Sequence, residues 1–230
     1  MSRRINTLFT ATALAAASSF VTAAVINNQQ DHANDQGIGF PEDFMANLQA
    51  YRTPGRQHKE MAKHAGTWDM TAKMWMDPDA PPQASEYVAT MQPIMGGRYM
   101  LESVEGKPGD MMPDMTYRGM NIMGYDNHKQ VYTYAWFDNM GTGIFTGEGS
   151  ANADGSVITY MSQAPDLENP GQMKPVKSVT RNVNEDKIIF EMYEIDDDGE
   201  WWKNFESVYT RADVRDAKMT GGYHIDRNIR

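Results

Sequence analysis

The sequence of 230 residues contains no cysteine. This absence excludes disulfide bonds, thiolate metal sites, cysteine nucleophiles and a lipoprotein anchor. Basic residues are also few, because 21 Lys and Arg stand against 31 Asp and Glu and give a formal net charge of −10. An acidic surface repels nucleic acids and anionic lipids, so we expect no nucleic-acid partner.

Long hydrophobic runs are lacking as well. The most apolar stretch, residues 5–21, is rich in alanine, threonine and serine, so a stable membrane anchor is not expected. Arg3 and Arg4 precede this stretch and three small residues at 22–24 follow it, a pattern typical of a secretory signal peptide. We predict that residues 1–23 are a signal peptide and that the protein is exported, either to the periplasm or out of the cell. The alternative is a disordered or helical N-terminus.

The segment after the predicted signal peptide is expected to be flexible and partly helical. It spans residues 24–53, with a helical pattern near residues 41–51. Pro54 can open a second short helix, which the pattern predicts to end before Gly66.

From Gly66 onward the sequence consists of short β-like runs separated by turn signals such as Asp154-Gly155. Strands are expected near residues 67–76, 84–92, 97–105, 116–125, 129–138, 143–150, 156–163, 174–183, 187–195 and 201–210. No helical period separates them, which disfavours a parallel sheet with crossover helices. A closed up-and-down barrel would cover the edges of so many antiparallel strands. We therefore predict an all-β fold with about ten antiparallel strands over residues 54–211, a short helical segment before them and a polar tail over residues 212–230.

Large side chains occupy both faces of the predicted strands. In residues 131–138, for example, Phe137 lies on one face and Trp136 on the other, so the pattern leaves open which face points inward. The candidate ligand-binding residues are Trp75, Arg98, Met120, Tyr134, Trp136, Asp138, Glu191, Tyr193 and Glu206. Arg98 could instead form a salt bridge with Glu102 or another acid, and Asp138 could bond to nearby backbone at a strand end.

Two features at the ends of the predicted barrel resemble the calycin superfamily, which includes lipocalins and fatty-acid-binding proteins. Gly66-Thr67-Trp68 opens the first strand, and Arg211 ends the last. The resemblance implies that the side chain of Arg211 lies over Trp68 and closes one end of the barrel.

Further stretches are similar to the bacterial family known as domain of unknown function 1579. They are His58-Lys59, Met74-Trp75-Met76-Asp77-Pro78, Met95-Gly96-Gly97-Arg98-Tyr99, Gly124-Tyr125-Asp126-Asn127, Trp136-Phe137-Asp138-Asn139-Met140-Gly141-Thr142-Gly143, Thr180-Arg181 and Phe190-Glu191-Met192-Tyr193-Glu194. The resemblance covers residues 54–211 and implies a calycin-like barrel, usually exported, with no established activity. It supplies no catalytic residue.

The predicted function is binding of a small, mainly apolar molecule inside the barrel, because a barrel of this size can hold one such ligand. The alternative is a structural or interaction domain whose barrel is filled by its own aromatic and methionine side chains. Glu191 and Glu206 could face each other as an acid–base pair, but strand carboxylates are more often solvated or paired, so no catalytic residue is predicted.

Metal and haem sites were weighed as less favoured alternatives. Met111, Met112 and Met115, with Met120 and Met123 following them, could bind copper through their thioethers, although methionine more often fills gaps in a core. Haem usually requires an inward histidine, and none of the five histidines falls within a predicted strand. His58 and its neighbour Lys59 are expected on the exposed side of their helix. No metal and no cofactor are therefore predicted.

Overall fold

The structure is a computed structural model that describes residues 40–106, 115–196 and 198–212. The predicted signal peptide, most of the segment that follows it, Met111, Met112 and all but the first residue of the polar tail lie outside the described residues. The chain divides into two compact units, Met1–Glu42 and Asp43–Arg230, and the strands described below all belong to the second.

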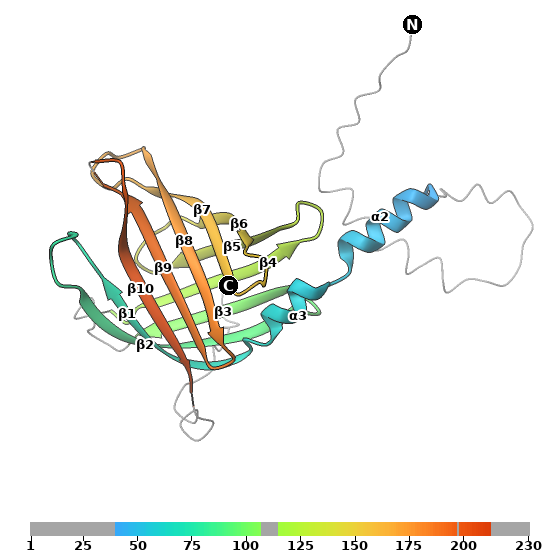
Figure 1. Ribbon diagram of the computed structural model, residues 1–230, viewed down its shortest axis with the longest axis horizontal. Helices are drawn as coiled ribbons and strands as arrows, with labels where there is room; N and C mark the ends of the chain where they lie inside the picture. The colour runs from blue at the N-terminus through green and yellow to red at the C-terminus, as the bar shows by residue number, and fades with distance from the viewer. Residues whose placement is uncertain (1–39, 107–114, 197, 213–230) are drawn as a thin grey trace, which may run out of the picture. The chain divides into compact units, whose positions relative to one another are not determined.

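The described residues form two helices and ten strands (Figure 1). The elements are α2 (Glu42–Arg52), α3 (Arg56–Ala62), β1 (Gly66–Met74), β2 (Gln83–Ile94), β3 (Tyr99–Gly106), β4 (Arg118–Asp126), β5 (Val131–Asp138), β6 (Phe145–Ala151), β7 (Val157–Pro165), β8 (Met173–Asn184), β9 (Lys187–Ile195) and β10 (Trp201–Arg211). Every predicted strand is present, and its ends lie within two residues of the prediction. Neither helix in the described part of the chain is long and apolar enough to cross a membrane.

The ten strands close into one antiparallel barrel, which confirms the predicted fold. Each strand pairs with its neighbours in sequence, and β1 pairs with β10 to complete the ring, as the two adjacent strands in Figure 1 show. Tight turns make this order possible. Gly155 and Gly199 take positive φ angles of 81° and 85° in the turns after β6 and β9, a conformation that side chains disfavour.

Burial along β1 identifies the inward face of the barrel. Trp68, Met70 and Ala72 are buried, whereas the residues between them are exposed. Cross-strand partners share a face, so the pairing register extends this assignment around the ring. On β5 the even-numbered residues from Tyr132 to Asp138 point inward, which resolves what the sequence pattern left open.

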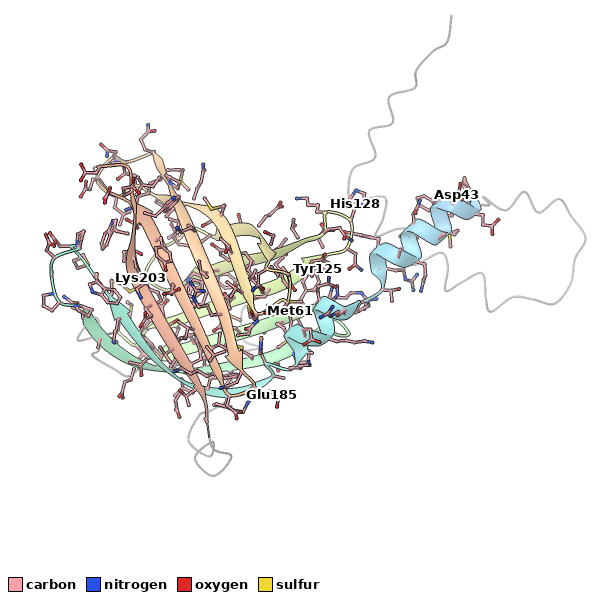
Figure 2. All side chains as sticks on the ribbon, in the orientation of Figure 1. Asp43, Met61, Tyr125, His128, Glu185 and Lys203 are labelled. Atoms are coloured by element: carbon pink, nitrogen blue, oxygen red, sulfur yellow. The ribbon has the colours of Figure 1, made fainter. Side chains whose placement is uncertain are left out.

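Helix α3 packs at one end of the barrel. Met61 contacts both groups of buried core residues, and Figure 2 labels it beside Tyr125 of β4.

The expectation for His58 was wrong: its side chain is only 6% exposed, and its ring meets that of Tyr125 edge to face. Its Nδ1 accepts the backbone N–H of Gly55, which caps the helix where glycine has no side chain to do so. Burial lowers the pKa of His58 below its ordinary value.

The indole of Trp68 is fully buried at this same end of the barrel, which we call the α3 end. Its Nε1 donates to the carbonyl oxygen of His64 at 3.0 Å, which ties β1 to the segment after α3. The guanidinium carbon of Arg211 lies 4.3 Å from the centre of the indole ring, within the range of a cation–π interaction.

The guanidinium of Arg211 also joins β10 to two other parts of the chain. It donates to the carbonyl oxygens of Lys63 and Ala65 before β1, and to that of Glu185 in the turn between β8 and β9 (labelled in Figure 2). A planar fork of five N–H groups suits this geometry, and a lysine ammonium does not reproduce it.

Replacement of Arg211 by lysine should therefore lower the free energy of unfolding by about 2–3 kcal/mol, because several carbonyl oxygens lose their donor. The melting temperature should fall by roughly 4–12 °C. Arg118→Lys serves as the control, since Arg118 forms only an exposed pair with Glu105 among the described residues. Thermal melts that place both variants at the wild-type temperature would contradict a closing role for Arg211.

Candidate ligand-binding site

Three of the nine candidate residues point into the barrel. They are Tyr134, Trp136 and Asp138, all on β5. Trp136 Nε1 and the hydroxyl group of Tyr117 both donate to Asp138 Oδ2, at 3.0 and 3.3 Å. The other oxygen, Oδ1, accepts the backbone N–H of Met140, so Asp138 also has the strand-end bond that the sequence offered as an alternative. Burial, and then the negative charge of Asp138, raise the pKa of Tyr117.

Five candidates lie on the outer face of the barrel. They are Trp75, Met120, Glu191, Tyr193 and Glu206. The pairing register decides this placement, because Met120 pairs with Phe137, and Glu206 pairs with Glu191. These residues therefore do not line the barrel interior. The sequence could not separate the faces, because both carry large side chains.

The outward carboxylates belong to an ion-pair network. Glu191 accepts from Arg181 Nε at 3.0 Å and from Lys203 Nζ at 3.3 Å, and Lys203 also pairs with Glu206. Figure 2 labels Lys203 on β10, and its ammonium lies 5.5 Å from the ring centre of Trp75. Although burial pushes the pKa of Glu191 upward, the hydrogen bonds from Arg181 and Lys203 hold it below its ordinary value. The two carboxylates share one cation, an arrangement typical of a structural network.

The ninth candidate, Arg98, lies in the turn between β2 and β3. Its guanidinium donates to the carbonyl oxygen of Met95 and to that of Arg52, the last residue of α2. The salt bridge to Glu102 is absent, because Glu102 points into the barrel and Asn121 binds it there.

Met120 and Met123 lie on opposite faces of β4, so they cannot contribute to one copper site.

Glu102 is the interior residue that the candidate set lacked. It is only 3% exposed, and its Oε2 accepts from Asn121 Nδ2 at 3.2 Å on the adjacent strand β4. Burial raises the pKa of the carboxyl group, whereas Asn121 and Tyr209 pull the pKa down. The sequence held a signal for this site. Glu102 alternates with the apolar Met100 and Val104, which marks it as an inward acid.

Buried polar atoms without a hydrogen-bond partner are concentrated among oxygens. Within the described residues these atoms are Glu102 Oε1, Asn121 Oδ1, Asn182 Oδ1, Asn204 Oδ1, Ser178 Oγ and Ser207 Oγ. Four of the six are carbonyl or carboxylate oxygens, and none is an N–H group. Buried polar groups in folded proteins almost always have a partner. Four of these atoms can only accept a hydrogen bond, whereas the hydroxyl groups of Ser178 and Ser207 can also donate one.

Inward residues differ in exposure along the barrel. At the α3 end Trp68, Ile158 and Ile188 are buried. Toward the opposite end, which we call the open end, the inward residues Trp136 and Trp202 keep intermediate exposure. Inward residues with intermediate exposure toward this end include Asn121, Trp136, Asp138, Phe145, Phe190, Trp202 and Phe205. The gradient is not uniform, because Tyr87 and Val104 toward this end are buried and Tyr125 near the α3 end keeps intermediate exposure. We call Glu102, Asn121, Tyr117, Trp136 and Asp138 the interior site.

A separate groove of about 490 Å³ lies on the outer wall of the barrel. Its lining includes the exposed side chains of Tyr99, Ile122 and Met161, together with threonines and Glu148. These residues belong to the outward face of β3, β4, β6 and β7, so the groove does not communicate with the interior site through their side chains. The groove is a second place where an apolar molecule could bind, and an experiment must distinguish the two.

Glycine makes room for an aromatic ring in the interior site. A Cβ atom at Gly119 would lie 2.4 Å from Cζ2 of Trp136. Gly119→Ala should therefore displace the indole and lower the free energy of unfolding by about 1–3 kcal/mol, measured by urea denaturation. Gly141→Ala is the control, because nothing lies within 4 Å of its added Cβ. Equal stability of the two variants would show that the ring has space to move.

Comparison with known proteins gives a family but no activity. The family described as "Protein of unknown function (DUF1579)" matches residues 53–211. No curated protein matches the chain. The crystal structure of Rv2717c from M. tuberculosis is similar with 11% identity and a TM-score of 0.48, covering 70% of this chain and 100% of that one. A redesigned β-barrel is similar with 15% identity and a TM-score of 0.34, covering 66% of this chain and 95% of that one. Because the family matches more than half of the sequence, this chain belongs to the DUF1579 family of proteins of unknown function.

Proposed function

We propose that the chain binds a small, mainly apolar molecule inside its barrel and does not transform it chemically. The observation that carries the proposal is the partial exposure of inward aromatic side chains toward the open end of the barrel. A barrel filled by its own side chains should bury these rings as fully as it buries Trp68 at the α3 end.

The inward residues toward the open end supply the contacts that such a ligand needs. Trp136, Phe190 and Phe205 offer apolar surface, and the rings of Phe190 and Phe205 meet edge to face at 6.3 Å. Ligand pockets are commonly lined by aromatic side chains with a few polar groups that fix orientation. Glu102, Asn121 and Asp138 are the polar groups of the interior site.

The strength of binding can be bounded from the buried area. A two-ring aromatic ligand that buries ~300 Å² of apolar surface gains about 7 kcal/mol at 25 cal/mol per Å². Losses of translational and rotational freedom offset part of this gain. The buried area alone therefore sets a lower bound of roughly 10 μM on the dissociation constant of a probe with no tailored polar contact.

We expect N-phenyl-1-naphthylamine, a neutral fluorescent probe, to bind with saturable fluorescence and a stoichiometry of one. Ser162→Trp should weaken this binding at least tenfold, because Ser162 points inward on β7 between Gly147 and Val176. Met161→Trp is the matched control, because Met161 is the preceding residue and its side chain lines the outer groove. Fluorescence titration measures both variants.

The same titration can contradict the proposal in two ways. If Met161→Trp alone abolishes binding, the probe occupies the outer groove and the interior proposal is wrong. If the well-folded wild-type protein binds no probe, the barrel is a filled scaffold. Circular dichroism establishes that each variant is folded, and Ser162→Leu replaces Ser162→Trp if the larger side chain prevents folding.

We also propose that residues 1–23 are removed on export, on the evidence of the basic start, apolar stretch and small residues in the sequence. After expression of the full chain in an exporting bacterium, the intact mass of the periplasmic protein should correspond to a chain that begins at Ala24. Reversal of charge at Arg3 and Arg4 to glutamate should leave more unprocessed chain in the cytoplasm. A periplasmic protein that still begins at Met1 would overturn the proposal.

A further inference from the structure

A carboxylate buried in an apolar barrel is costly unless a cation or several donors face it. Glu102 is only 3% exposed. Its Oε2 accepts from Asn121 Nδ2 at 3.2 Å, the phenol of Tyr209 on β10 also hydrogen-bonds the carboxyl group, and Oε1 has no partner. The oxygen Oδ1 of Asn121 also has no partner. Two unpartnered acceptors thus lie on adjacent strands of the interior site.

We propose that the ligand of the barrel is an amine, and that Glu102 and Asn121 bind its protonated nitrogen. The proposal rests on the proposed function, since it names the chemical class of the molecule bound at the interior site. An ammonium group carries three N–H donors and no acceptor, which complements a pair of unpartnered acceptors. A charge-assisted bond to a carboxylate is stronger than a neutral one.

No basic side chain serves Glu102 within the described residues. The groups that influence its carboxyl group are Asn121 from β4 and Tyr209 from β10, and both are uncharged. Tyr117, which lies close enough to sense the charge of Glu102, is a further neutral phenol. Lys174 on β8 also belongs to the inward face, but its ammonium pairs with Glu194 Oε2 at 2.7 Å. The side chains that the structure describes thus supply no cation to hold Glu102 ionised, and the ammonium group of a ligand would supply one.

The remaining charges of the interior favour a cation over an anion. Asp138 lies in the same site and already accepts hydrogen bonds from Trp136 and Tyr117. Aromatic ring faces attract cations through their quadrupole, and Trp136 is one such ring at the site. A carboxylate ligand would meet Glu102 and Asp138, and the side chains that the structure describes offer no unpaired cation at this site to offset the repulsion. Water could also donate to these acceptors, and this is the outcome that the experiment below must exclude.

The melting temperature of the ligand-free protein should show that burial of an ionised Glu102 is destabilising. Because burial raises its pKa, ionisation of the carboxyl group does not affect stability below its ordinary pKa, where both states are protonated, and it lowers the free energy of unfolding as the pH rises above that value. Glu102→Gln removes this penalty and keeps an acceptor for Asn121. The variant should melt at the wild-type temperature near pH 4 and roughly 2–6 °C higher at pH 7. A variant that melts lower than wild type at pH 7 would mean that Glu102 supports the fold, and would overturn the proposal.

Binding is tested by displacement of N-phenyl-1-naphthylamine with three compounds of nearly equal size. They are 2-(1-naphthyl)ethylamine, 1-ethylnaphthalene and the anion of 1-naphthaleneacetic acid (naphthylacetate), which are cationic, neutral and anionic at pH 7. The amine should bind wild type at least tenfold more tightly than ethylnaphthalene, and naphthylacetate should bind more weakly than either. Glu102→Gln should lose the preference for the amine and keep its affinity for ethylnaphthalene.

Glu105→Gln is the matched control, because Glu105 lies on the same strand, points outward and pairs with Arg118. It should preserve the wild-type preference. Equal affinities of wild type for the amine and for ethylnaphthalene, or a preference that survives in Glu102→Gln, would overturn the amine proposal while leaving the proposed function intact. Failure of the naphthylamine probe itself to bind would instead overturn the proposed function.

Discussion

The pairing of β1 with β10 is the constraint on which the rest of the structure depends. It runs from Trp68 opposite Arg211 to Met74 opposite Phe205, between strands at opposite ends of the barrel sequence. Without it the sheet would keep two open edges, which expose unpaired backbone groups. Closure also fixes the face of every strand, because a register shift of one residue would exchange inward and outward side chains. The stacking of Arg211 on Trp68 lies at one end of this seam and joins it to the chain that follows α3.

Small residues then determine where the large rings of the interior lie. Added Cβ atoms at Gly119 and Gly147 would come within 2.4 Å of the rings of Trp136 and Tyr134. The two glycines thus leave the space that these rings occupy against the opposite strand. Across the strands, Asn121 pairs with Trp136, whereas Glu102 lies between Asn121 and Met91.

Two glutamates show how the barrel wall gives one residue type opposite properties. Glu191 faces outward, where Arg181 and Lys203 hold its pKa below the ordinary value despite its burial. Glu102 faces inward, where burial dominates and raises its pKa. The outward carboxylate has its cations within the chain. The inward one has none among the described residues, which is why it is the one from which a ligand can be inferred.

The sequence by itself determined the strands and their order, because turn residues and period-two alternation are local signals. It also indicated the family, through short stretches such as Gly66-Thr67-Trp68 and those that follow it. Only the tertiary structure decided which face of each strand points inward, since that depends on closure between β1 and β10. For this reason the alternation names Glu191 and Tyr193 as candidates although they face outward, and it misses Glu102, which faces inward. The burial of His58 depends likewise on tertiary packing, here of α3 against β4. Inward and outward positions have the same period, so the alternation of large side chains cannot distinguish them.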